Sequence, residues 1–250
     1  MKFVLKILLI LAVAAFLVYS LMRVPGSTSE IQCTGIEVEI NDSLKSGLVT
    51  KQDLETIIQK SNISVEGKKI SEINISELQN TLCLNPYIDT AYASFNASGK
   101  LILTAIPRRP VLHVMPDGGK EYYLDSKGAS MPIDSLNENL AIVTGKVSLE
   151  LAETKLATLG RCIQDSVFWK MQVQQIDVRE EYDVRMYTRI ANHVIHLGSL
   201  DSIPDKLHRL RVFYQQGLPQ TGWDKYESLS VEYQGMVVGT KKKKDKKTGY

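Results

Sequence analysis

The feature that most constrains this chain is an apolar run close to its N-terminus. Ile7–Met22 contains sixteen residues without a charge, and extension to Phe3 and Val24 brings the run close to the length of a membrane span. A helix needs about 20 mainly apolar residues to cross a bilayer. We therefore expect residues 1–24 to form a short cytoplasmic stub and one transmembrane helix.

The charges beside this run predict its orientation. Lys2 and Lys6 precede it, whereas only Arg23 follows it before Lys45. Basic residues gather on the cytoplasmic side of a span, so we expect the N-terminus in the cytoplasm and the rest of the chain across the membrane.

A cleaved signal peptide is the alternative interpretation of the same run, and it requires small residues after the apolar core. Ala12–Ala14 has that pattern but lies inside the run, which would leave an apolar core of only five residues, Ile7–Leu11. A later site would place the large residues of Leu21–Arg23 where small ones are needed. We therefore favour an uncleaved anchor.

The formal net charge of +2 is unevenly distributed. Residues 241–250 carry six lysines and one aspartate, and the first 23 residues carry three basic residues. Val24–Thr240 therefore has a net charge of −6, which argues against a nucleic-acid-binding surface. We expect the lysine-rich tail, 241–250, to be disordered because its like charges repel. It would aid solubility or contact anionic lipid or wall polymer weakly.

The cysteines give no framework for a disulfide network or a zinc site. Cys33, Cys83 and Cys162 are an odd number without CxxC spacing. Buried apolar cysteines are the favoured interpretation, and one disulfide with a free thiol stays open.

After a polar linker, 25–31, the chain shows a compact succession of elements. Residues 36–40 alternate between apolar and charged, as in a half-buried strand. Thr50 and Asn74 each precede a short amphipathic helix as N-cap residues. Two strand-like runs follow, separated by a hairpin signal. The expected order is strand, helix, helix, strand, strand, over residues 36–40, 51–60, 75–85, 88–96 and 101–106.

This order, with Leu84–Ile88 reading Leu-Asn-Pro-Tyr-Ile between the second helix and the hairpin, resembles a POTRA domain over residues 32–110. One POTRA directly after one anchor resembles the bacterial cell-division family FtsQ, called DivIB in Gram-positive species. Pro110 matches the family's domain ending, although the acidic residue of that ending is missing. Tyr123–Gly128 resembles the turn that opens the family's second, β-rich domain.

The remaining residues, 111–240, are expected to form that β domain. An amphipathic helix is predicted by apolar residues at spacings of 3, 4, 3 and 4: Leu149, Ala152, Leu156, Leu159 and Ile163. Strands are expected over 173–178, 184–188 and 193–197, a helix from Ser202, and a closing strand over Leu229–Val238. The predicted fold class is α+β: one transmembrane helix, a POTRA domain (β-α-α-β-β) and a C-terminal, mainly antiparallel β domain with flanking helices.

No catalytic or cofactor motif stands out, and we expect neither an enzyme nor a metal site. The sequence contains no GxGxxG, P-loop, GxSxG or HExxH pattern. His193 and His196 are three apart on an expected strand, so they face opposite sides and cannot chelate one metal.

Function is then expected on surfaces, first at the closing strand. A last strand often forms a sheet edge that can pair with a partner's strand. The resemblance implies that this edge recruits the small coiled-coil division proteins FtsB and FtsL. The candidate partner-binding residues are Leu229, Val231, Glu232, Tyr233 and Val237 on the strand, with Arg209 and Tyr214 on the preceding helix.

The second candidate surface is the POTRA face, with Arg108, Arg109 and the strand 88–96. Both arginines could equally be a solvated strand end.

The resemblance implies a non-enzymatic divisome protein of the cell inner membrane, with its bulk in the periplasm, that acts in septum formation. It implies no cofactor, nucleic acid or small-molecule substrate. The alternative is a POTRA-type accessory for polypeptide transport or outer-membrane protein assembly, and a wall-processing enzyme is a third, weaker possibility.

Overall fold

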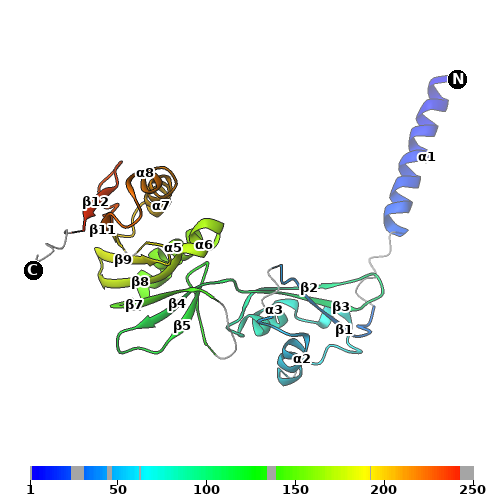
Figure 1. Ribbon diagram of the computed structural model, residues 1–250. Coiled ribbons are helices and arrows are strands. Elements are labelled where there is room, and N and C mark those ends of the chain that lie inside the picture. The colour runs from blue at the N-terminus through cyan, green and yellow to red at the C-terminus, as the bar shows by residue number, and fades with distance from the viewer. Residues whose placement is uncertain are drawn as a thin grey trace, which may run out of the picture. The chain divides into compact units, whose positions relative to one another are not determined.

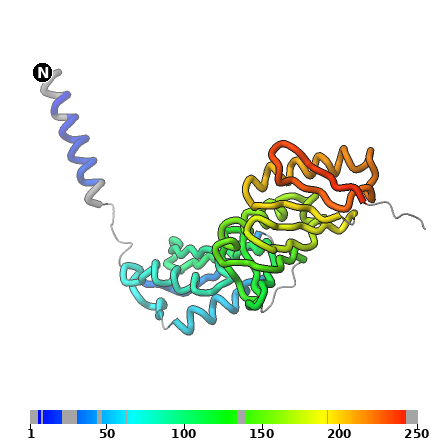
Figure 2. Tube along the Cα trace, turned by 90° about the vertical axis from the view of Figure 1, so that its left-hand side faces the viewer, coloured from blue at the N-terminus to red at the C-terminus, as the bar shows by residue number. Residues whose placement is uncertain are grey.

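The computed structural model describes residues 2–23, 31–43, 47–61, 63–133, 139–191 and 193–242. Contacts divide the chain into two compact units, residues 1–107 and 108–250. The predicted linker, apart from Ile31, and the predicted tail beyond Lys242 lie outside the described residues. Figures 1 and 2 trace the elements of each unit.

The N-terminal apolar run forms a single helix, α1, Lys2–Arg23. Within the part of the chain that the structure describes, no helix meets the combined length and apolarity of a membrane span. The membrane anchor therefore stays a prediction from the sequence.

The expected order of elements in the first unit is confirmed. A three-stranded sheet has the strand order β1-β3-β2, with β1 parallel and β2 antiparallel to β3. Helices α2 and α3 pack on this sheet (Figure 1), and their apolar residues share one core with it. The bounds are Ile36–Ile40 (β1), Lys51–Lys60 (α2), Ile75–Cys83 (α3), Ile88–Phe95 (β2) and Leu101–Pro107 (β3).

Both predicted helix caps are present. Thr50 accepts a hydrogen bond from the Asp53 amide at 3.2 Å, and the Asp53 carboxylate accepts one from the Thr50 amide at 2.8 Å. Hydrogen bonds from Thr50 also lower the pKa of Asp53. The Asn74 side chain accepts from the Glu77 amide at 3.2 Å. These bonds satisfy amides that have no partner within the helix.

The second unit is built on a nine-stranded sheet with the order β12-β11-β10-β9-β8-β7-β4-β5-β6. Five of its eight described strand pairings are antiparallel and three are parallel, namely β4 with β7, β7 with β8, and β10 with β11. The sheet is therefore mixed, with an antiparallel majority. The bounds are Pro110–Pro116 (β4), Tyr122–Asp125 (β5), Ser130–Met131 (β6), Ala141–Gly145 (β7), Val173–Glu180 (β8), Asp183–Thr188 (β9), Val194–Gly198 (β10), Tyr226–Ser230 (β11) and Val238–Lys241 (β12).

Helices of the second unit share a single large core with the sheet. Two of them contain a π-helical turn, over Ala152–Leu156 and Phe213–Gly217. The α-helical segments are Leu149–Leu151 (α4), Ala157–Gln164 (α5), Val167–Gln172 (α6), Ile203–Val212 (α7) and Leu218–Thr221 (α8).

The predicted apolar stripe of the first of these helices is confirmed except at its start. Leu156, Leu159 and Ile163 are fully buried. Leu149, at the first helical position, is 61% exposed. Periodicity gives the buried face but not the residue at which packing begins.

Gly160 sets how closely α5 approaches the sheet. A Cβ atom at this position would lie 2.7 Å from Leu112 Cγ and 2.7 Å from Val111 Cγ2, both on the buried strand β4. Any side chain here must push the helix away or displace two fully buried residues.

We predict that Gly160→Val destabilises the second unit by about 1 to 3 kcal/mol, because overpacking outweighs the gain in helix propensity. Both tryptophans, Trp169 and Trp223, lie in this unit, so urea unfolding followed by tryptophan fluorescence reports on it alone. Arg161→Val, at the exposed neighbouring position, is the matched control and should change stability much less. Equal effects of both variants would contradict the close-packing argument.

Candidate functional site

The closing strand predicted over Leu229–Val238 is wrong as a single element. Strand β11 ends at Ser230, β12 begins at Val238, and the chain reverses between them. Gly235 has a φ of +76° in this connection, a conformation that favours glycine. The Gln-Gly pair at 234–235 was the available turn signal, but the apolar alternation around it dominated the prediction.

Strand β12 is one of the two edges of the sheet (Figure 1) and, among the described residues, pairs only with β11. The pairs are Ser230 with Val238, Leu229 with Gly239, Ser228 with Thr240 and Tyr226 with Lys241. The Lys242 amide, just beyond the strand, donates to the Lys225 carbonyl at 3.1 Å. Peptide groups alternate in direction along a strand, so those of Gly239 and Lys241 point away from β11.

An aromatic side chain covers the glycine of this edge strand. A Cβ at Gly239 would meet the Tyr226 ring at 2.5 Å. The Tyr226 ring also packs edge-on against Phe213 from the preceding helix, with 5.8 Å between centroids. Edge glycines are commonly stabilised by a cross-strand aromatic ring in this way.

The predicted partner-binding residues divide into a buried and a surface group. Leu229 and Val231 are 0% exposed and Tyr214 is 2% exposed, so their side chains belong to the core. Glu232 and Tyr233 are exposed, Tyr233 by 59%, and Val237 is half-buried. Direct side-chain contact with a partner is thus open only to the second group.

Arg209, on α7, holds the connection between β11 and β12. Its Nη1 donates to the carbonyls of Tyr233, at 2.8 Å, and Met236, and its Nη2 donates to the Val231 carbonyl at 3.2 Å. Its Nε donates to Asp205 one helical turn earlier, at 2.9 Å. Residues that leave a sheet lose their ladder partners, and here one side chain replaces three of them.

Lys206, on the same helix, likewise bonds backbone carbonyls at the end of β10. Its Nζ donates to the carbonyls of Leu197, at 2.9 Å, and Ser199, at 2.7 Å. The side chain is buried, and this burial lowers the pKa of Lys206. Nothing local in the sequence distinguishes a lysine that bonds backbone carbonyls from a solvated one, so this role of Lys206 was not predictable.

Tyr214, in the π-helical turn Phe213–Gly217, lies in a buried aromatic cluster. Its ring makes edge-on contacts with Phe168, Trp169 and Trp223 at centroid distances between 5.8 and 6.0 Å. Burial raises the pKa of Tyr214 to about 12, so its hydroxyl is neutral at physiological pH.

A chain of hydrogen bonds starting from His193 fixes the protonation of this residue. Thr188 donates its hydroxyl proton to the Ile190 carbonyl at 2.9 Å, so it accepts from Tyr214 at 3.1 Å. Tyr214 must then accept from His193 Nε2 at 2.7 Å. The proton of neutral His193 is therefore on Nε2, and Nδ1 is buried without a hydrogen-bond partner among the described residues.

A second proton on His193 would be placed on that buried nitrogen. Burial lowers the pKa of His193, and the nearby charge of Lys242 lowers it further. Below the unfolded pKa of about 6.5 the unfolded chain binds a proton that the folded chain does not, so stability decreases as pH falls.

We predict that the second unit loses stability between pH 7 and pH 5 by at most about 1.4 kcal/mol per pH unit from His193 alone. Urea unfolding followed by tryptophan fluorescence at each pH measures this loss. His193→Gln retains a donor for Tyr214 and cannot titrate, so its stability should depend less on pH. An identical pH profile in the variant would contradict the assignment.

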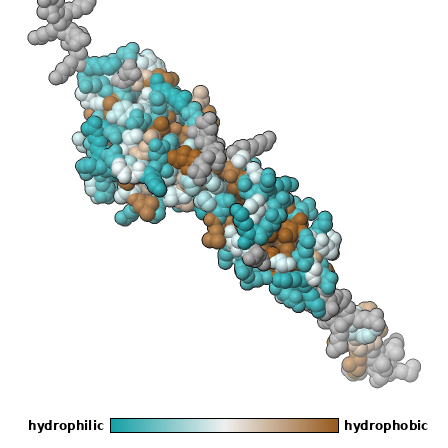
Figure 3. All heavy atoms as spheres, turned by 90° about the horizontal axis from the view of Figure 1, so that it is seen from below, coloured by the Kyte–Doolittle hydropathy of each residue, from teal (hydrophilic) through white to brown (hydrophobic). Residues whose placement is uncertain are grey.

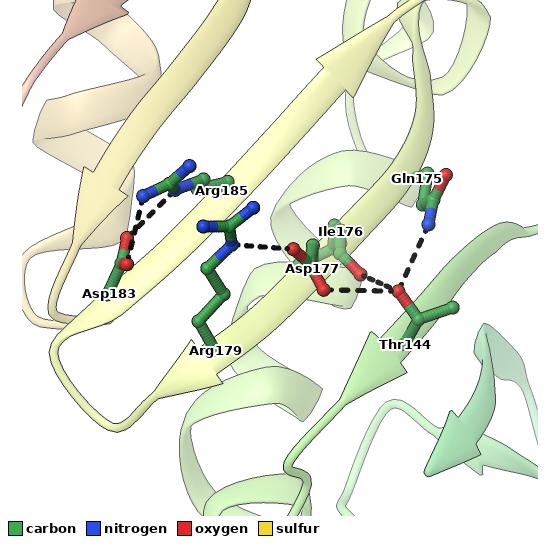
Figure 4. Close-up of polar contacts among 7 residues, drawn as sticks. All are labelled: Thr144, Gln175, Ile176, Asp177, Arg179, Asp183 and Arg185. Atoms are coloured by element: carbon green, nitrogen blue, oxygen red, sulfur yellow. Dashed lines mark hydrogen bonds and ion pairs between the residues drawn. The ribbon is translucent and has the colours of Figure 1, made fainter. Parts of the chain in front are cut away.

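The face of the sheet opposite to the buried one carries paired polar side chains. Ile176 and Val178 of β8 face the core, so the alternating residues Gln175 and Asp177 face the other way. Thr144 Oγ1 accepts from Gln175 at 3.0 Å and lies 3.5 Å from Asp177 (Figure 4).

The charges on this face are balanced within it. Asp177 accepts from Arg179 at 3.2 Å, and Asp183 accepts from Arg185 at 3.0 and 3.1 Å (Figure 4). The hydrogen bond from Arg185 lowers the pKa of Asp183. Paired charges of both signs give no strong field for a charged ligand.

The two arginines predicted for the POTRA face belong to the second unit. Arg108 donates to the buried carboxylate of Asp125 at 2.8 Å, and Arg109 pairs with Asp165 at 2.8 Å. Asp125 also accepts from the amides of Lys127 and Ala129, as expected for a turn residue. Arg108 thus has a structural role in this turn.

Within the described ranges no group of three or more His, Cys, Asp or Glu side chains could hold a metal ion. All three cysteines are free, with Cys33 buried, Cys162 half-buried and Cys83 exposed. The face of the molecule shown in Figure 3 is mainly hydrophilic, with apolar residues in small separate patches on each unit.

Two family profiles match the sequence. A profile described as FtsQ/DivIB, C-terminal related, matches residues 109–240, and a profile described as a POTRA-like domain matches residues 31–105. The first match covers more than half of the 250 residues. A search of curated proteins found no match.

Proposed function

The chain belongs to the FtsQ/DivIB, C-terminal related family, as its motifs predicted, and on this basis we propose that it is a non-catalytic divisome protein. It acts in septum formation by binding other division proteins outside the cytoplasm. The family membership supports the cell-division role. The mode of binding is supported by the β12 edge, which has no neighbour on its outer side among the described residues.

The observation that carries the proposed binding mode is the outward direction of the Gly239 and Lys241 peptide groups. A partner strand can bond to these groups and extend the nine-stranded sheet by one. Main-chain bonds supply affinity, while exposed side chains such as Tyr233 and Val238 contribute to selection. The proposed partners are FtsB- and FtsL-like coiled-coil division proteins.

We place the protein in the inner membrane, with the Phe3–Met22 segment as a single type II anchor and both folded units in the periplasm. This proposal depends on the apolar run and on the basic residues before it.

A POTRA-type transport or assembly accessory is the second candidate function. The observation in its favour is strand β2, an eight-residue edge of the three-stranded sheet on which Tyr92 is 55% exposed. An extended polypeptide could pair with this edge by the same main-chain chemistry.

Depletion of the protein in its own bacterium separates the two functions. We predict long filaments with failed septa and a normal outer-membrane protein profile, measured by microscopy and quantitative proteomics. Normal septation with depleted outer-membrane proteins would overturn the division role and favour the transport function. Re-expression of the wild-type chain, which should restore septation, is the control.

The binding mode is tested at one main-chain donor. We predict that Lys241→Pro abolishes co-purification of the coiled-coil partners, because proline removes the outward N–H of the edge strand and its ring blocks pairing. Lys241→Ala removes the same side chain but retains the N–H, so it should bind like the wild type. Circular dichroism verifies that both variants are folded. Equal binding by the two variants would contradict strand addition at β12.

A further inference from the structure

We propose that Arg209 is a positioning residue for partner binding, because its guanidinium holds the β11–β12 connection and so keeps β12 in place as a preformed edge. This inference rests on the proposed function of that edge.

The geometry around Arg209 is specific to a guanidinium group. The carbonyls of Val231, Tyr233 and Met236 converge on its two Nη atoms, while Asp205 occupies Nε. Arginine presents five N–H donors in a rigid planar fork. A lysine ammonium is a single point of charge on a flexible stem, so it cannot reproduce three bonds in fixed directions.

The connection matters for β12 because, apart from the Tyr226 ring over Gly239, that strand is held only by its pairing with β11. It is four residues long and has one described neighbour, β11. An edge strand has main-chain hydrogen bonds on one side only. If β12 detached, a partner strand would have to order it before pairing, and this ordering would reduce affinity.

The Arg209 side chain is too little exposed for direct contact with a partner. Its side chain is only 13% exposed, and four of its five donors are directed at groups of this chain. Its effect on binding is therefore transmitted through the connection, which distinguishes it from exposed residues such as Tyr233.

The experiment compares Arg209→Ala, Arg209→Lys and wild type in the full-length protein. The first measurement is hydrogen exchange at the Lys242 amide, whose bond to the Lys225 carbonyl reports whether the end of β12 is paired with β11. The second is dissociation of the FtsB-like protein of the same bacterium. The matched control is Arg211→Ala, which removes an exposed arginine of the same helix that contacts the Phe168 ring.

We expect Arg209→Ala to exchange the Lys242 amide about tenfold faster or more, and to release the partner faster by a similar factor. Arg209→Lys should behave like Arg209→Ala, and Arg211→Ala like the wild type. Added methylguanidinium should slow the exchange in Arg209→Ala and leave the wild type unchanged, an effect that general destabilisation would not produce.

Three results would overturn the inference. The first is an unchanged Lys242 exchange rate in Arg209→Ala, and the second is wild-type exchange and partner dissociation in Arg209→Lys. The third is faster partner dissociation in Arg209→Ala while the Lys242 amide remains protected. If Arg209→Ala does not fold, as judged by tryptophan fluorescence, Asp205→Asn replaces it. This variant retains the guanidinium but weakens its orientation, so a smaller increase in exchange supports the inference and none overturns it. If wild type and variant capture the partner equally, only the positioning role is rejected. If the wild type captures no partner, the proposed function is rejected.

Discussion

The packing of helices onto one face of the nine-stranded sheet is the interaction on which the rest of the second unit depends. Gly160 allows α5 to lie directly on Val111 and Leu112, and in β8 and β9 the alternation of side chains commits Ile176, Val178, Val184 and Met186 to the core. The residues between them form the polar, charge-balanced face of Figure 4. Because one face is buried and the other is internally paired, the main groups left for specific recognition are those of the sheet edge.

An exposed edge carries a risk of indiscriminate pairing, and β12 has features that reduce it. The strand is short, and Lys241 and Lys242 place positive charge at its end. The same brevity makes the strand dependent on its connection, whose carbonyls are bonded by Arg209. The shortness of β12 therefore both reduces the risk of aggregation and makes the strand depend on Arg209.

Much of the fold could be predicted from the sequence because its signals are local. The caps at Thr50 and Asn74 need only neighbouring residues, and the stripe through Leu156 and Ile163 needs only helical periodicity. The prediction of one closing strand was wrong because its only local turn signal was the Gln-Gly pair at 234–235, while the bonds from Arg209 to this connection come from more than twenty residues earlier in the chain. Alternation places Leu229, Val231 and Tyr233 on one face of an extended strand, but only Leu229 and Val231 are buried, whereas Tyr233 is 59% exposed. The pattern does not record whether the backbone remains extended.

For the same reason, a sequence pattern does not distinguish residues that contact a partner from residues that support the fold of the binding edge. Tyr214 is close to the edge in sequence, but it is buried in an aromatic cluster and bonded to His193 and Thr188. Its substitution would perturb the core and the edge together, so a loss of binding would not distinguish contact from folding. Only changes confined to the edge backbone, or to the side chain that fixes its connection, separate these effects. The structure therefore moves the centre of the candidate site from side chains selected by alternation to main-chain groups, whose direction a sequence pattern does not encode.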